Sequence, residues 1–230
     1  MKKYKHIFFD LDGTLWDFAG NSKDTQFEMF DRFSLYSIFN TYDDFFEIFN
    51  KNNDQLWEEY RHGKIKKSKL KWYRFYLSLK EKNVEDESLA RSLDEFYLSE
   101  SPKKTKLIPH TIEMLEELKS KYALHIITNG FNEVQFTKLE NSKLDTYFNV
   151  IVTSENAGVL KPDIRIFQYA LEKAGAGYAE SLMIGDILEV DIVGARMAGL
   201  DQIYLNPGGN SHNETISYEV CSLKEILKIL

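Results

Sequence analysis

Two aspartates near the start of the chain, Asp10 and Asp12, stand where a short apolar run ends. The run, residues 7–9, is typical of a buried strand, and the acidic residues and Gly13 after it predict an exposed carboxyl end. Ligands bind outside such ends in open α/β sheets. Carboxylates this close repel each other, and a hard cation such as Mg²⁺ would offset the repulsion. A simple strand-ending turn is the alternative interpretation.

Three later segments place polar residues at strand ends or helix starts. Residues 128–130, Thr-Asn-Gly, end an apolar run, and their hydroxyl, amide and backbone N–H groups suit a phosphate. Lys161 precedes Pro162 at a predicted helix start, where a lysine opposes the macrodipole and needs another anion nearby. Asp186 ends a further strand as a candidate second metal ligand, with Asp191 in the helix that follows. Taken singly, the alternatives are an Asn-Gly turn, a solvated lysine and a helix-capping aspartate.

The composition bounds the class of protein. A net charge of −7 over 230 residues argues against binding to nucleic acid or to an anionic membrane surface. The single cysteine, Cys221, cannot form an internal disulfide, which favours a reducing compartment, so we expect a cytoplasmic protein. No apolar run approaches the length of a transmembrane helix.

Two patterns of hydrophobic residues divide the chain. Apolar residues recur at three- and four-residue steps from about residue 21 to residue 102, with breaks near 40, 62 and 83, which predicts four helices. Beyond residue 102, helices and strands alternate, which predicts a parallel sheet covered on both faces. The expected strands are residues 7–9, 123–128, 150–152, 182–184 and 202–205, and the expected helices of this part are 111–121, 133–144, 162–174, 189–197 and 223–229.

We expect the opening strand to belong to the later sheet, so the helical segment is an insertion. The predicted fold is therefore an α/β protein with a Rossmann-like parallel sheet core, residues 1–16 and 106–230, and an inserted α-helical bundle cap, residues 17–105. Aromatic residues are dense in the bundle and would form either its core or a face that stacks a base or sugar. They are Trp57, Tyr60, Trp72, Tyr73, Phe75 and Tyr76.

In this order, the four motifs resemble those of the haloacid dehalogenase-like superfamily, and the insertion resembles the helical C1 cap of that superfamily. The resemblance covers the whole chain. It implies that Asp10 is a nucleophile that forms an aspartyl-phosphate, and that Asp12 is first the general acid and then the base. Because a departing alkoxide needs an acid and a halide does not, the presence of Asp12 favours phosphoryl chemistry over dehalogenation.

The same resemblance implies how substrate and metal are held. Thr128 and Lys161 would hold the phosphoryl oxygens, and Asn129 would orient the phosphate or the nucleophile. Mg²⁺ would be bound by Asp10, the backbone carbonyl of Asp12, and Asp186. Asp191 would support the metal site by contacts to these ligands.

Three further segments resemble the bacterial pyrimidine 5′-nucleotidases of this superfamily. They are Leu15-Trp16-Asp17-Phe18, Leu56-Trp57-Glu58-Glu59-Tyr60 followed by Gly63, and Ile127-Thr128-Asn129-Gly130-Phe131 followed by Leu139-Glu140. The expected partner is thus a small phosphate ester, a pyrimidine nucleoside 5′-monophosphate. The alternatives are a sugar-phosphate or pyrophosphate phosphatase, a β-phosphoglucomutase-like mutase, or a binding protein without turnover.

Overall fold

A computed structural model describes residues 4–230, and the chain divides into two compact units. One unit comprises Met1–Phe18 and Thr105–Leu230, and the other comprises Ala19–Lys104. The sequence pattern predicts these boundaries at residues 16–17 and 105–106, and residues 1–3 of the first predicted segment lie outside the described part. The first unit is therefore built from two stretches that are distant in sequence.

The first unit contains a six-stranded, wholly parallel sheet with the order β3-β2-β1-β4-β5-β6. This confirms the predicted α/β class. The first strand of the chain lies at the centre, between β2 and β4, where Phe9 is in register with both Ile126 and Ile184. The strands are β1 (His6–Phe9), β2 (Ala123–Thr128), β3 (Val150–Thr153), β4 (Ser181–Gly185), β5 (Asp201–Leu205) and β6 (Tyr218–Val220).

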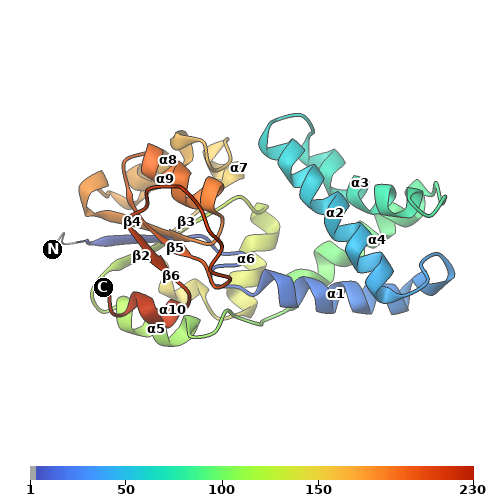
Figure 1. Cartoon of the computed structure of the whole chain (residues 1–230), viewed down its shortest axis with the longest axis horizontal. Coiled ribbons are helices and arrows are strands. Elements are labelled where there is room, and N and C mark those ends of the chain that lie inside the picture. The colour runs from blue at the N-terminus through green and yellow to red at the C-terminus, as the bar shows by residue number, and fades with distance from the viewer. Residues whose placement is uncertain (1–3) are drawn as a thin grey trace. The chain divides into compact units, whose positions relative to one another are not determined.

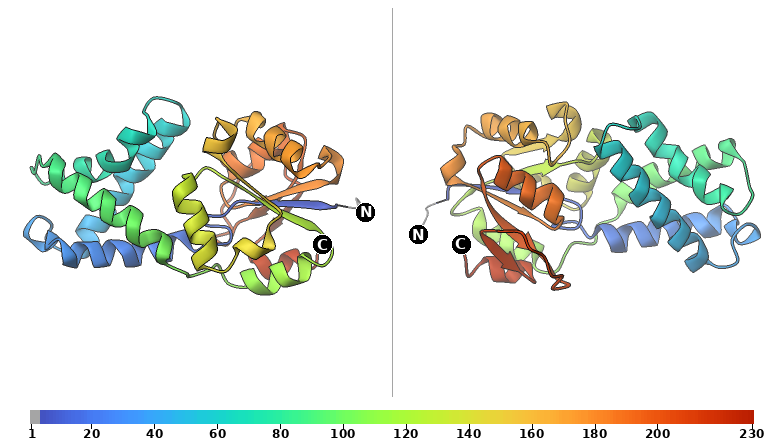
Figure 2. Two further views of the ribbon diagram at one scale, coloured as in Figure 1. Left: turned by 180° about the vertical axis from the view of Figure 1, so that it is seen from behind. Right: turned by 45° about the horizontal axis from the view of Figure 1, so that its top comes forward.

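Helices cover both faces of this sheet (Figures 1 and 2). Side chains alternate along a strand, so Ile7 and Phe9 pack into one apolar core while Phe8 packs into the other. The first core includes residues of α5, α6 and α10, and the second includes residues of α8 and α9. The helices of this unit are α5 (Thr111–Leu118), α6 (Asn132–Asn141), α7 (Ser154–Ala157), α8 (Ile164–Ala174), α9 (Gly194–Met197) and α10 (Leu223–Ile226), with a π-helical segment at Leu188–Val193 and 3-10 turns at Asp145–Tyr147 and Tyr178–Glu180.

Several predicted helix bounds are wrong. The helix expected from residue 162 begins at Ile164, because the Asp163 side chain accepts a hydrogen bond from the Arg165 backbone N–H and caps it there. The helix expected over residues 189–197 is a π-helical segment followed by the short α9. The short helix α7, whose first turn is capped by the Thr153 side chain, is not among the predicted helices.

The second unit contains four helices, as the periodicity predicts, and a core rich in phenylalanine. Side-chain caps start two of them, since Thr41 accepts from the Asp44 N–H and Asp86 accepts from the Leu89 N–H. Of the six aromatic residues in the dense segment, Phe75 is fully buried in this core, and the others are half-buried. The helices are α1 (Phe18–Arg32), α2 (Tyr42–Arg61), α3 (Lys67–Lys80) and α4 (Glu87–Glu100), with 3-10 turns at Leu35–Ser37 and Ser101–Lys103.

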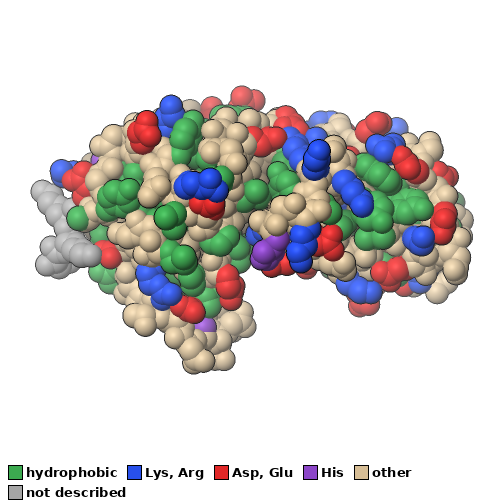
Figure 3. Space-filling view, turned by 90° about the horizontal axis from the view of Figure 1, so that it is seen from above, with side chains coloured by type: hydrophobic (Ala, Val, Ile, Leu, Met, Phe, Trp, Pro, Cys, Tyr) green, Lys and Arg blue, Asp and Glu red, His purple; other side chains and the backbone are tan. Residues whose placement is uncertain are grey.

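Charged side chains of both signs are interspersed on the face of the protein that Figure 3 shows. This face presents no continuous basic surface of the kind that a nucleic acid would need. Over residues 4–230, every helix is too short or too polar to cross a bilayer.

Candidate active site

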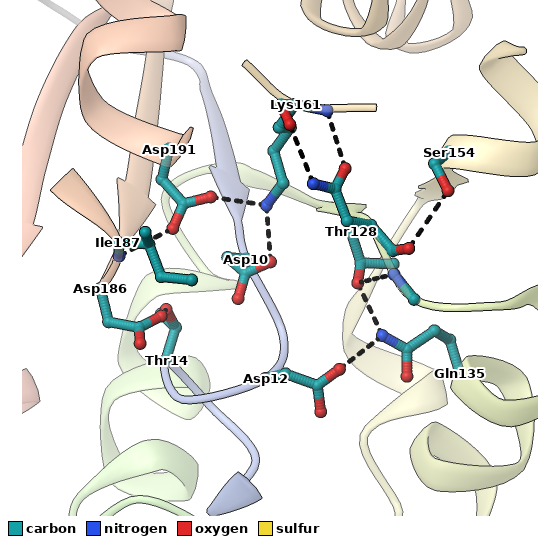
Figure 4. A network of polar contacts seen from close by, with 12 residues as sticks. Asp10, Asp12, Thr14, Thr128, Gln135, Ser154, Lys161, Asp186, Ile187 and Asp191 are labelled. Atoms are coloured by element: carbon teal, nitrogen blue, oxygen red, sulfur yellow. Dashed lines mark hydrogen bonds and ion pairs between the residues drawn. The ribbon is translucent and has the colours of Figure 1, made fainter. Parts of the chain in front are cut away.

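The carboxyl ends of three neighbouring strands bring the predicted site residues together. Asp10 follows β1 directly, Thr128 is the last residue of β2, and Asp186 follows β4. Because β1 lies between the other two strands and all run parallel, their ends meet at one edge of the sheet. Figure 4 shows these side chains around a common centre, with Lys161 and Asp191 among them.

Lys161 is the cation at this centre. Its Nζ donates to Asp10 Oδ1 and to Asp191 Oδ1, each at 2.6 Å, and its side chain is 1% exposed. Burial opposes the charged amine, but the two carboxylates outweigh burial and raise the pKa of Lys161 above its usual value. Asp10 and Asp191 therefore supply the negative charge that a lysine at this position needs.

Three carboxylates gather around Lys161. Asp10, Asp186 and Asp191 each offer an oxygen, and the three oxygens lie within 4.8 Å of one another. Burial, together with the nearby Asp191 carboxylate, raises the pKa of Asp186 to about 7, against the effect of a hydrogen bond from Thr14. One ammonium does not balance three carboxylates, and hard oxygen donors are those that Mg²⁺ prefers. The donor set therefore fits a divalent cation.

Asp186 does not cap the helical segment after it, which was the alternative interpretation of this residue. The backbone N–H of Ile187 donates instead to Asp191 Oδ2 at 3.0 Å. Asp186 Oδ1 accepts from Thr14 Oγ1 at 2.8 Å, so its carboxylate faces the turn after β1. Gly13 in that turn has a φ of +91°, and a Cβ there would lie 2.3 Å from Asp186 Oδ2. A glycine is thus required for this contact.

Asn129 holds the backbone of Lys161. Its Oδ1 accepts from the Lys161 N–H at 2.7 Å, and its Nδ2 donates to the Lys161 carbonyl at 3.0 Å. The Asn129 carbonyl accepts from Ser154 Oγ at 3.2 Å, which fixes the loop further. Both polar atoms of the Asn129 side chain therefore serve to place the lysine.

Thr128 presents its hydroxyl from the end of β2. The oxygen accepts from the Gly130 backbone N–H at 3.1 Å and from Gln135 Nε2 at 2.6 Å. Both contacts use Oγ1 as the acceptor, so its own proton is left to donate to a ligand. A phosphoryl oxygen is a suitable acceptor for that proton.

Two residues that no sequence motif predicts, Gln135 and Lys138, both contact Asp12. Gln135 Nε2 donates to Asp12 Oδ2 at 2.7 Å, and Lys138 Nζ donates to Asp12 Oδ1 at 2.5 Å. The two residues are three apart on α6 and so share a helix face. That spacing is visible in the sequence, but nothing local indicates which residue the face meets.

The sequence is similar to those of known hydrolases. Residues 4–199 match the haloacid dehalogenase-like hydrolase family. The chain is 34% identical to pyrimidine 5′-nucleotidase YjjG of Escherichia coli, covering 99% of this chain and 98% of that protein. It is 31% identical to pyrimidine 5′-nucleotidase PynA of Streptococcus pneumoniae, covering 99% of this chain and 95% of that one.

A solved structure gives the same result for the fold. The magnesium-bound putative HAD-hydrolase YfnB of Bacillus subtilis superposes with a TM-score of 0.90 at 29% identity, covering 99% of each chain. The protein therefore belongs to the haloacid dehalogenase-like hydrolases, and it is an enzyme of the phosphatase type within that family.

Proposed function

We propose that the protein is a Mg²⁺-dependent 5′-nucleotidase that hydrolyses pyrimidine nucleoside monophosphates through an aspartyl-phosphate on Asp10. The observation that carries the chemistry is the bridge of Lys161 between Asp10 and Asp191, with Asp12 two residues from the nucleophile. The substrate class rests on the full-length similarity to two pyrimidine 5′-nucleotidases.

The first half of the reaction transfers the phosphoryl group to Asp10. Lys161 engages Asp10 Oδ1, which leaves Oδ2 to attack phosphorus. The new Asp10–phosphorus bond forms as the bond between phosphorus and the nucleoside oxygen breaks, and that oxygen takes a proton from the Asp12 carboxylic acid. The Thr128 hydroxyl and the Lys161 ammonium hold the phosphoryl oxygens meanwhile.

The second half returns the enzyme to its starting state. Asp12, now a carboxylate, takes a proton from water while the water oxygen attacks phosphorus. The bond between phosphorus and Asp10 breaks, which releases inorganic phosphate and leaves Asp12 protonated again.

Mg²⁺ would be held by Asp10, the backbone carbonyl of Asp12, and Asp186, with Asp191 beside these ligands. When bound, it supplies positive charge that offsets the repulsion between the Asp10 carboxylate and the phosphate dianion. Asp191 already contacts both Lys161 and the Ile187 backbone, so it fixes the elements that carry this site.

Phosphate release from a panel of substrates tests this proposal. The panel holds pyrimidine and purine monophosphates, sugar phosphates and pyrophosphate, each with Mg²⁺ and with EDTA. We expect turnover of pyrimidine monophosphates that EDTA abolishes. Asp10→Asn should lower it by at least about 10³-fold, since the amide cannot act as the nucleophile. The matched control, Asp145→Asn, alters an exposed aspartate of the same unit and should keep full activity.

Two results would contradict the proposal. Turnover confined to sugar phosphates or pyrophosphate would keep the chemistry and reject the nucleotidase assignment. Full turnover in EDTA would reject the metal requirement.

A further inference from the structure

The side chain of Asp12 is held from both sides by one helix. Lys138 donates to Oδ1 and Gln135 donates to Oδ2, and both residues lie on α6. A carboxyl group has about four lone-pair positions, so the two contacts fix its plane and still leave a position for the proton that Asp12 gives up in the first step and takes back in the second. The Asp12 side chain is 25% exposed, which is consistent with access for a ligand.

Lys138, one of the two residues that donate to Asp12, is a buried lysine. Only 5% of its side chain is exposed, and its ammonium lies 4.2 Å from the ring centre of Trp16 and 5.7 Å from that of Phe18. A buried lysine is costly unless a counterion and hydrogen bonds compensate it. Asp12 supplies that counterion, and the two rings supply cation–π contacts on the other sides.

Gln135 joins Asp12 to the residue that ends β2. The same Nε2 donates to Asp12 Oδ2 and to Thr128 Oγ1. The amino end of the Gln135 amide therefore faces Asp12 and Thr128. A Cβ on residue 130 would lie 2.0 Å from that nitrogen, so only glycine at that position leaves room for it. The Thr-Asn-Gly motif and Gln135 therefore fit together.

We propose that Gln135 and Lys138 are positioning residues that aim Asp12 at the leaving-group oxygen. Through Thr128, Gln135 also fixes Asp12 relative to the phosphoryl group. This inference rests on the proposed function, because it assigns the two residues to the proton transfer made by Asp12. Neither residue is required to touch the substrate.

The test compares two substrates that differ in their need for an acid. A nucleoside oxygen, as in uridine 5′-monophosphate, must be protonated as it leaves, whereas 4-nitrophenolate leaves without a proton. We expect Lys138→Met to lower kcat/KM for uridine 5′-monophosphate by about 100-fold, and for 4-nitrophenyl phosphate by less than about fivefold. Gln135→Leu removes no charge and should show the same selectivity at about tenfold.

Two further variants separate positioning from a general loss of structure. Lys138→Arg keeps the positive charge and should recover most of the lost kcat/KM. Lys119→Met is the matched control, because Lys119 also pairs with a carboxylate, Glu116 at 2.7 Å, and lies 5.0 Å from the Tyr147 ring centre, but on the surface. It should leave both substrates unaffected.

An equal loss on both substrates in Lys138→Met and Gln135→Leu would overturn the inference, since phosphate binding or general damage would explain it. Unchanged kinetics in both variants would overturn it as well. Failure of the parent protein to hydrolyse either substrate would instead reject the proposed function, and with it this role.

Discussion

At the scale of single residues, the site depends on two glycines that lack a Cβ as well as on its charged side chains. Gly13 leaves room for the Asp186 carboxylate, and Gly130 leaves room for the Gln135 amide. Lys161 donates to Asp10 and Lys138 donates to Asp12, so each of the two early aspartates contacts a lysine from a different part of the chain. Around the strand ends, each early aspartate therefore has a lysine partner, and each of the two glycines leaves room for a neighbouring polar side chain.

Gly130→Ala tests this close fit. The new Cβ would collide with the Gln135 amide and displace it from Asp12 and Thr128, so we expect kcat/KM for uridine 5′-monophosphate to fall about tenfold or more. Steady-state kinetics measure this.

A double-mutant comparison shows whether the collision is the cause. In a Gln135→Ala background the added methyl group meets no amide, so Gly130→Ala should cost much less there. Gly177→Ala is the control, because its nearest neighbour, the Glu180 side chain, would be 3.6 Å away. Equal losses in the parent and Gln135→Ala backgrounds would contradict the account.

At the scale of elements, the sequence predicted the central strands and the presence of α6, but it did not predict the contact of α6 with Asp12. Buried parallel strands read as apolar runs, so β1, β2 and β4 were found close to their observed bounds. In contrast, β6 has three residues, of which Tyr218 and Glu219 are exposed, and so carries no apolar run. The contact of α6 with Asp12 spans more than 120 residues of sequence, and no local pattern encodes it.

The pairing of β1 with β2 places His125 opposite Phe8, and this predicts a pH effect on stability. The His125 ring stacks on Phe8 at 4.7 Å and on His6 at 5.4 Å, and the residue is 1% exposed. Burial, and to a lesser extent the neighbouring His6, lowers the pKa of His125 to about 4. The unfolded chain, with a histidine pKa near 6.5, then binds this proton more readily than the folded chain.

The stabilisation due to neutral His125 is therefore present above about pH 6.5 and is lost as the pH falls towards 4. We expect the loss of this stabilisation to lower the free energy of unfolding by roughly 1 to 2 kcal/mol between about pH 7.5 and about pH 5. Urea denaturation at both pH values, in the parent and in His125→Phe, measures this. The same pH dependence in both proteins would show that another group is responsible.

At the scale of the whole molecule, the order of the chain explains why the motifs could be found and some contacts could not. The catalytic unit is assembled from two stretches of sequence, and three of the four motifs follow strands whose ends the topology brings to one edge, while Lys161 lies in the loop before α8. Regular alternation of helix and strand was enough to predict that edge. No such pattern predicts that Gln135 and Lys138 contact Asp12, because this contact depends on how α6 packs against the sheet.

In the proposed reaction Asp10 becomes covalently phosphorylated, and trapping this intermediate in a variant would detect it. Asp12→Asn should still transfer the phosphoryl group from 4-nitrophenyl phosphate, which needs no acid, but should fail to activate water. Mass spectrometry of the acid-quenched variant should then find one added phosphoryl group on the peptide that contains Asp10, and none in Asp10→Asn. Release of 4-nitrophenol without an adduct, or an adduct on another residue, would contradict the account.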